Sequence, residues 1–198
     1  MKKIFLVLFS LLMFGQVSAQ EQQTLMGSLK NKRVGGFGGP MLHIASLNGR
    51  TTVASGGGGG VILNNFFVGG YGQGEFYENF NTINTTTYDL EIGTGGLWLG
   101  WTPVGEKLLH PYLSVKVGGG AINYEVNNDN SVNDRTDAIW SLHPEVGAEM
   151  NINNWFRAGI VVGYRYMGGV NLNVPNVSAA DFNRPTVGLH FRFGYFGY

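Results

Sequence analysis

The stretch Trp155–Tyr166, W-F-R-A-G-I-V-V-G-Y-R-Y, separates into two sets when every second residue is taken. One set is apolar and ends in two tyrosines: Phe156, Ala158, Ile160, Val162, Tyr164 and Tyr166. The other carries two arginines among mostly small residues: Trp155, Arg157, Gly159, Val161, Gly163 and Arg165. Because a β-strand sends alternate side chains to opposite faces, this period of two predicts a strand with one continuously apolar face. A helix would mix the sets, and the interior glycines would weaken it.

The composition extends this prediction to the whole chain. Of 198 residues, 32 are glycine and only 13% are charged, whereas soluble domains average about 7% glycine and about 25% charged residues. The glycines follow no collagen period and lie among Val, Ile, Phe, Tyr and Trp, which predicts many strands and turns. No apolar run of 18 or more residues follows the N-terminal segment, so we expect no transmembrane helix in the mature protein.

Residues 1–19 have the features of a secretory signal peptide. Lys2 and Lys3 precede an apolar core, Ile4–Phe14, and small residues up to Ala19 form a cleavage site. Cleavage there leaves 11 basic and 13 acidic residues, a charge of −2, so there is no electrostatic case for nucleic acid as a partner. Cysteine is absent, which excludes disulfides, thiolate catalysis and an N-terminal lipidated cysteine.

Beyond a polar leader, residues 20–32, eight segments have strand character. They are Arg33–Ala45, Arg50–Leu63, Phe66–Tyr77, Thr86–Trp101, Pro111–Tyr124, Asp137–Ile152, Trp155–Met167 and Arg184–Tyr198. From the third connection on, the connections alternate between long (Asn79–Thr85, Glu125–Thr136, Gly168–Asn183) and shorter (Thr102–His110, Asn151–Asn154). Short turns at one end and long loops at the other are typical of outer-membrane β-barrels.

The last four segments separate charge from apolar residues. The proposed lipid-facing set is Leu113, Val115, Val117, Gly119, Ala121, Asn123, Trp140, Leu142, Pro144, Val146, Ala148, Met150, Phe156, Ala158, Ile160, Val162, Tyr164, Tyr166, Val187, Leu189, Phe191, Phe193 and Tyr195. None of these is charged, and every charge in these strand cores falls on the opposite face. An Arg or Lys facing lipid near the midplane costs about 2–4 kcal/mol, so this segregation is expected of a membrane barrel.

The first four segments are less regular. Gly56–Gly60 carries little information on register, and glycine there would allow large inward side chains to pack closely. In the fourth segment, the apolar residues change parity between Ile92 and Leu97, and a bulge at Gly95-Gly96 would restore a single apolar face. Pro144, which has no N–H to donate, predicts a local bulge or a strand end.

The last ten residues, Leu189–Tyr198, alternate apolar side chains and end in an aromatic residue. With the signal peptide and eight strands, the chain resembles the small outer-membrane β-barrels of the OmpX and OmpA-transmembrane-domain type, in a Gly-rich form like many from Bacteroidetes. The resemblance covers residues 33–198. It implies an all-β, eight-stranded antiparallel transmembrane β-barrel in the cell outer membrane, a monomer whose partners are outer-membrane lipid and the assembly machinery.

A soluble, lipocalin-like barrel is the competing interpretation, with the apolar face around a ligand and the charged face in water. The low charge, the glycines on the polar face and the aromatics near strand ends favour lipid.

The sequence offers little catalytic or metal-binding chemistry. Ser141, His143 and Glu145 alternate on one face, but alternate strand residues stand about 6.5–7 Å apart, and we expect a polar barrel interior there. Asp129, Asp134 and Asp137 lack the spacing of a calcium loop, and a solvated acidic loop is expected. His43, His110, His143 and His190 are far apart in sequence and predict no zinc site. No cofactor is expected.

The interior charges predict a structural role. A barrel of eight strands is only wide enough for its side chains to fill, so buried charges need partners. The predicted lumenal network is Glu75, Asp89, Glu91, Lys116, Glu145, Glu149, Arg157, Arg165 and Arg192. The predicted function is a non-enzymatic barrel with a structural or surface-interaction role through its outer loops. The alternatives are a small-solute channel or carrier and a lipid-modifying barrel enzyme.

Overall fold

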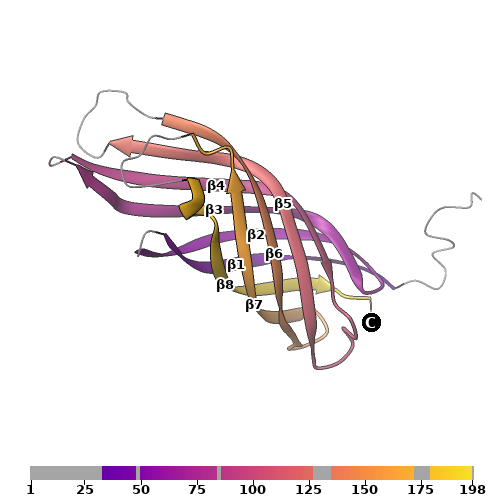
Figure 1. The fold of residues 1–198 in the computed structure, drawn as a ribbon. Coiled ribbons are helices and arrows are strands. Elements are labelled where there is room, and N and C mark those ends of the chain that lie inside the picture. Colours follow the sequence, from indigo (N-terminus) through magenta and orange to yellow (C-terminus); the bar gives the residue numbers. More distant parts are fainter. Residues whose placement is uncertain (1–32, 48–49, 84–85, 127–134, 172–178, 198) are drawn as a thin grey trace, which may run out of the picture. The chain divides into compact units, whose positions relative to one another are not determined.

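The computed structural model describes residues 33–47, 50–83, 86–126, 135–171 and 179–197. Eight antiparallel strands form a closed barrel in sequence order, with β8 hydrogen-bonded to β1 (Figure 1). They are β1 (Val34–Leu47), β2 (Arg50–Leu63), β3 (Phe66–Ile83), β4 (Thr86–Trp101), β5 (Leu109–Val126), β6 (Arg135–Asn151), β7 (Phe156–Gly168) and β8 (Arg184–Tyr195). Within the described part of the chain, no helix is long and apolar enough to cross a membrane. The predicted signal peptide and leader, and Tyr198, lie outside the described residues.

The predicted strands all exist, and β2 and β4 have the predicted ends. The main differences lie at the end of the barrel away from Arg33 and Gly197, the first and last residues that the structure describes. β3 continues to Ile83 through the predicted polar connection, and β5 and β6 are also longer than expected. Within the predicted long connection Gly168–Asn183, β7 ends at Gly168, and Ala179–Phe182 forms a 3-10 helix, η2. Phe182 is buried against the barrel interior, which explains why this segment turns inward.

The predicted apolar face of β5–β8 lies outward. Every residue of that set is exposed or half-exposed, and along most of these strands it alternates with buried ones. Trp155 was expected on the inner face but precedes β7, and 58% of its surface is exposed beside the ring of Phe193, 6.0 Å away. Since β7 begins only at Phe156, strand alternation does not orient this residue.

Exposed aromatic side chains gather near both ends of the barrel wall. Phe66 stacks on Trp101 at 6.0 Å, and Phe156 stacks on Phe193 at 4.7 Å, on the side of the chain termini. Towards the opposite end, the rings of Tyr164 and Tyr166 lie 4.7 Å apart. Tyr166 pairs with Leu142 of β6, and the exposed Trp140 lies two residues further towards that end on the same strand. Aromatic girdles on both sides of an apolar band mark the two interfaces of a membrane-spanning barrel.

The predicted bulge in β4 is absent. Without it, the side chains in the first half of the strand point to the opposite faces from those predicted. β4 pairs with β5 without interruption from Tyr88 to Trp101. Leu90 and Ile92 are therefore buried in the lumen, and Glu91 is exposed on the outside. The change of parity has a physical cause: the lumen is apolar at this level, so the inward residues of β4 are apolar there and polar residues face outward.

Pro144 causes neither a bulge nor a strand end. It pairs with Val115 of β5, and the register between β6 and β7 is the same on both sides of it. The β6–β7 pairing is only interrupted at His143 and Pro144. A proline on the outward face lacks an N–H for the ladder, which accounts for the local gap.

Two apolar clusters fill much of the lumen. The terminus-side cluster is Phe37, Met41, Ile62, Phe67, Tyr71, Trp98, Tyr112, Val161 and Phe196. The outer cluster is Leu47, Tyr77, Leu90, Ile92, Ile122, Tyr124, Ile139, Met167 and Phe182. Glycine makes room for the largest of these rings, as expected for Gly56–Gly60: a Cβ on Gly58 would lie 2.9 Å from Trp98.

Candidate functional site

Buried charge in the lumen is organised around three glutamates, Glu75, Glu145 and Glu149. Seven of the nine predicted network residues are buried: Glu75, Lys116, Glu145, Glu149, Arg157, Arg165 and Arg192. Glu91 was expected inside but is exposed, and Asp89, of the same parity, is half-exposed. Both follow from the uninterrupted register of β4 described above.

The outer network is centred on Glu75 of β3. Arg165 Nη2 donates to both oxygens of Glu75, at 2.9 and 2.6 Å, and Arg184 Nη2 donates to Oε2 at 2.5 Å. All three side chains are buried. Arg184 was missed in the sequence because it is the first residue of its strand, although it shares the parity of Arg192.

The terminus-side network is centred on Glu149 of β6. Arg192 forms two hydrogen bonds to this carboxylate, one from Nε at 2.6 Å and one from Nη2. His110 Nε2 lies 3.0 Å from Glu149 Oε2, and Arg157 Nη1 lies 3.4 Å from it. The Arg192 guanidinium also lies 4.7 Å from the Phe37 ring centre, so the ion network and the terminus-side apolar cluster form one continuous packing.

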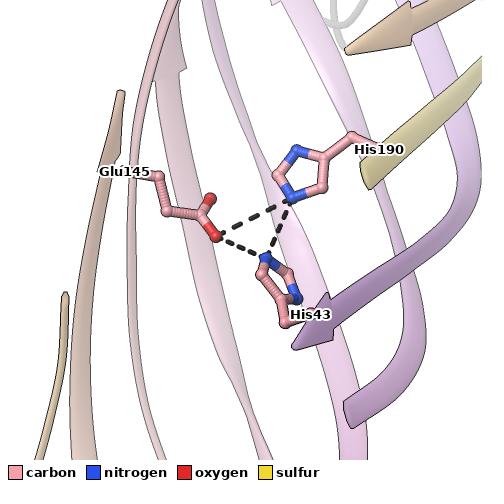
Figure 2. A group of neighbouring side chains, drawn as sticks. All are labelled: His43, Glu145 and His190. Carbon is pink, nitrogen blue, oxygen red and sulfur yellow. Dashed lines mark hydrogen bonds and ion pairs between the residues drawn. The ribbon is translucent and has the colours of Figure 1, made fainter. Parts of the chain in front are cut away.

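Between these two networks lies a central cluster around Glu145. Lys116 Nζ donates to Glu145 Oε1 at 2.5 Å, and Ser114 Oγ donates to Oε2 at 2.7 Å. His43 Nε2 lies 2.7 Å from the same Oε1 atom (Figure 2). At most 5% of the surface of Glu145, Lys116 or His43 is exposed, so the cluster is shielded from solvent.

Two more histidines complete the central cluster. His190 Nε2 lies 3.2 Å from His43 Nε2 and 3.7 Å from Glu145 Oε1 (Figure 2). His143 Nε2 also lies 3.7 Å from Glu145 Oε1 and forms a 2.8 Å hydrogen bond with Thr186 Oγ1. The four histidines are far apart in sequence and predicted no zinc site, yet three of them meet here. Strands β1, β6 and β8 bring them together across the lumen, and linear spacing cannot reveal this.

Two glycines create the space that the cluster occupies. An ideal Cβ on Gly188 of β8 would lie 2.5 Å from His43 Cδ2 and 2.8 Å from its Nε2. One on Gly163 of β7 would lie 2.9 Å from His143 Nε2 and 3.0 Å from Glu145 Cγ. Because real Cβ atoms do not approach other atoms so closely, both positions require glycine for the observed packing.

The other sequence candidates do not converge on a catalytic arrangement. Ser141 Oγ bonds with Tyr71 at 3.1 Å, and His143 bonds with Thr186. Ser141 thus bonds with Tyr71 rather than with His143, so Ser141, His143 and Glu145 do not form one hydrogen-bonded chain, although His143 Nε2 lies 3.7 Å from Glu145 Oε1. Asp129 and Asp134 lie outside the described residues, and Asp137 accepts a 2.6 Å hydrogen bond from the backbone of Asn171.

Comparison with known proteins supports the architecture. No family model matches the chain, and no curated protein matches its sequence. Among solved structures, Neisserial surface protein A is similar, with a TM-score of 0.53 and 15% identity over 81% of this chain and 96% of that one. The N-terminal β-barrel domain of Pseudomonas aeruginosa OprF (TM-score 0.47, 14% identity, 83% and 98%) and Yersinia pestis Ail (0.45, 15%, 83% and 99%) are also similar. The chain therefore has the fold of the small eight-stranded outer-membrane β-barrels.

Proposed function

We propose that this protein is a non-enzymatic outer-membrane barrel that acts through the surface it presents beyond the lipid, at the end away from its termini. The observation that carries the proposal is the change in the outward surface of the longest strands. A membrane-spanning strand needs about 9–11 residues. β3 and β5 each have 18, β6 has 17 and β4 has 16.

The surplus length carries polar residues on the outside. Glu91, Asn123 and Thr136 are paired in register across β4, β5 and β6. Thr136 Oγ1 donates to Asn123 Oδ1 at 2.9 Å. This row lies beyond the Trp140 girdle, so the wall meets water there. A rigid polar wall supporting the predicted outer loops is a suitable platform for binding cationic or hydrogen-bonding partners.

The packed lumen supports a closed barrel over the alternative of a solute channel. Three charge networks, centred on Glu75, Glu145 and Glu149, and two apolar clusters occupy the lumen, and η2 places Phe182 in the outer cluster. The separate partners of Ser141 and His143 likewise argue against a lipid-modifying enzyme. The proposed location and orientation follow the usual arrangement, with the termini on the periplasmic side.

Single-cysteine variants test the location, because the natural chain has no cysteine. Thr136→Cys should react with a membrane-impermeant maleimide on intact cells. Asn153→Cys, in the exposed turn before β7, should react only after the outer membrane is permeabilised. Equal labelling of both on intact cells, or recovery of the protein in the soluble periplasmic fraction, would contradict the proposal.

Two measurements then address the function. In planar bilayers, the purified protein should give no large, stable conductance steps, and such steps would establish a channel instead. Replacing residues 127–134 by a Gly-Ser turn should leave heat-modifiable migration intact and abolish adhesion to host or neighbouring-cell material. If the shortened protein assembles and adheres like the wild type, that loop is not the binding element.

A further inference from the structure

We propose that His43, Glu145 and His190 form a lumenal binding site for a divalent transition-metal ion, with zinc as the best-fitting ion. The three side chains come from β1, β6 and β8 and direct Nε2, Oε1 and Nε2 toward one another (Figure 2). Two imidazoles and one carboxylate are a donor set that suits zinc. This inference concerns the barrel interior and does not depend on the proposed surface role.

The distances within the triangle fit a single small ion. Its sides are 2.7 Å from His43 to Glu145, 3.2 Å from His43 to His190 and 3.7 Å from His190 to Glu145. Zinc–nitrogen and zinc–oxygen bonds of about 2.0–2.2 Å at tetrahedral angles place ligand atoms about 3.3–3.5 Å apart. The observed sides scatter around that spacing, and the His43–Glu145 distance must lengthen by about 0.6–0.8 Å to seat an ion.

The hydrogen-bonding chemistry of the cluster also favours a cation. A carboxylate only accepts hydrogen bonds, and a lysine ammonium only donates them. His43 Nε2 must carry a proton to bond with Glu145 at 2.7 Å, but must lack one to accept from Lys116 Nζ at 3.5 Å. Since no single protonation state satisfies both contacts, the metal-free cluster is incompletely paired. A metal ion would accept lone pairs from all three ligand atoms at once.

Ligation through Nε2 would leave the proton of each histidine on Nδ1, where the acceptor that usually orients a metal-bound imidazole is missing among the described residues. Among the residues described, neither His43 Nδ1 nor His190 Nδ1 has a hydrogen-bond partner, although each residue is only 1% exposed. A histidine that binds a metal through Nε2 is neutral and carries its proton on Nδ1. Gly188 supplies the space for the His43 ring, since a Cβ there would lie 2.8 Å from the ligand atom.

Lys116 is the competitor for this position. Its ammonium lies 2.5 Å from Glu145 Oε1 and currently balances that carboxylate. The flanking networks each place two arginines on one glutamate, so the lumen already carries excess positive charge at both levels. An incoming dication must therefore displace or neutralise Lys116, and removal of the lysine charge should strengthen metal binding.

The test uses untagged full-length protein refolded into detergent micelles with zinc or cobalt present, because the filled lumen would restrict later entry. After exhaustive dialysis, metal content is measured by mass spectrometry and cobalt coordination by visible absorption. We expect about one equivalent of metal and the intense bands of four-coordinate cobalt. We also expect Lys116→Met to bind at least tenfold more tightly, and zinc to raise its urea midpoint.

The chain supplies a matched control in His110. This histidine is also buried and lies 3.0 Å from a glutamate, Glu149, but it is not part of the His43–Glu145–His190 triangle. His43→Gln and His190→Gln should lose the metal, whereas His110→Gln should retain it, with heat-modifiable migration reporting folding of each. The proposal is overturned if the wild type and Lys116→Met both emerge without stoichiometric metal. It is equally overturned if bound cobalt is six-coordinate, or if His110→Gln loses as much metal as His190→Gln.

Discussion

Gly188 of β8 leaves the gap that the imidazole of His43 fills: a Cβ at position 188 would lie 2.5 Å from His43 Cδ2. The backbone carbonyl of Leu42 is also only 3.0 Å from that position, so a methyl group has no free direction. The central cluster therefore depends on a residue that has no side chain, and this leads to the first prediction.

Gly188→Ala should lower the free energy of unfolding by about 1–3 kcal/mol, the usual cost of adding a methyl group to a filled interior. The measurement is the urea midpoint of the protein in lipid vesicles. Gly93→Ala is the control, because a Cβ on Gly93 meets nothing within 4 Å. Equal midpoints for both variants would mean that the His43 ring is not seated against Gly188.

Glu75→Gln should destabilise the barrel by about 3–5 kcal/mol, because it removes the charge shared by two buried arginines, Arg165 and Arg184. Glu91→Gln is a change of the same chemical kind at an exposed position, and it should stay within about 0.5 kcal/mol. Urea unfolding of the two variants side by side separates these cases. A cost at position 91 as large as at position 75 would contradict the uninterrupted register of β4.

Ile160→Arg should destabilise the protein by about 2–4 kcal/mol in vesicles, since it places a charge on the lipid face near the middle of β7. Thr136→Arg lies on the outside beyond the Trp140 girdle and should cost at most about 1 kcal/mol. Refolding yield and the urea midpoint report both. If Arg at position 160 were tolerated as well as at position 136, the apolar wall would not face hydrocarbon.

Fluorescence distinguishes the one lumenal tryptophan from the three on the outside. Trp98 is 1% exposed, whereas Trp101, Trp140 and Trp155 are 41%, 55% and 58% exposed. A variant that retains only Trp98 should show little quenching by lipids brominated in their acyl chains. A variant that retains only Trp140 should be strongly quenched. Strong quenching of Trp98 would mean that this face of β4 points to the lipid and not to the lumen.

The sequence determined the features that repeat along each strand. Alternation at Phe156–Tyr166 separates apolar from charged side chains, and it predicted the strands, the lipid face of β5–β8 and the inward charges of β6–β8. This works because the period of a strand is local: two residues define it wherever one face is lipid and the other is not. Interior charges such as Arg157 and Glu149 were identifiable for the same reason.

Only the tertiary structure decided which interior residues meet. His43 and His190 are 147 positions apart and become neighbours because β8 closes on β1. Leu90 and Ile92 point inward because the part of the lumen beside them is apolar. Residues from five other strands and η2 form that apolar cluster. Closure and register are properties of all eight strands together, so no periodicity within one segment could have placed two imidazoles and Glu145 around a single point.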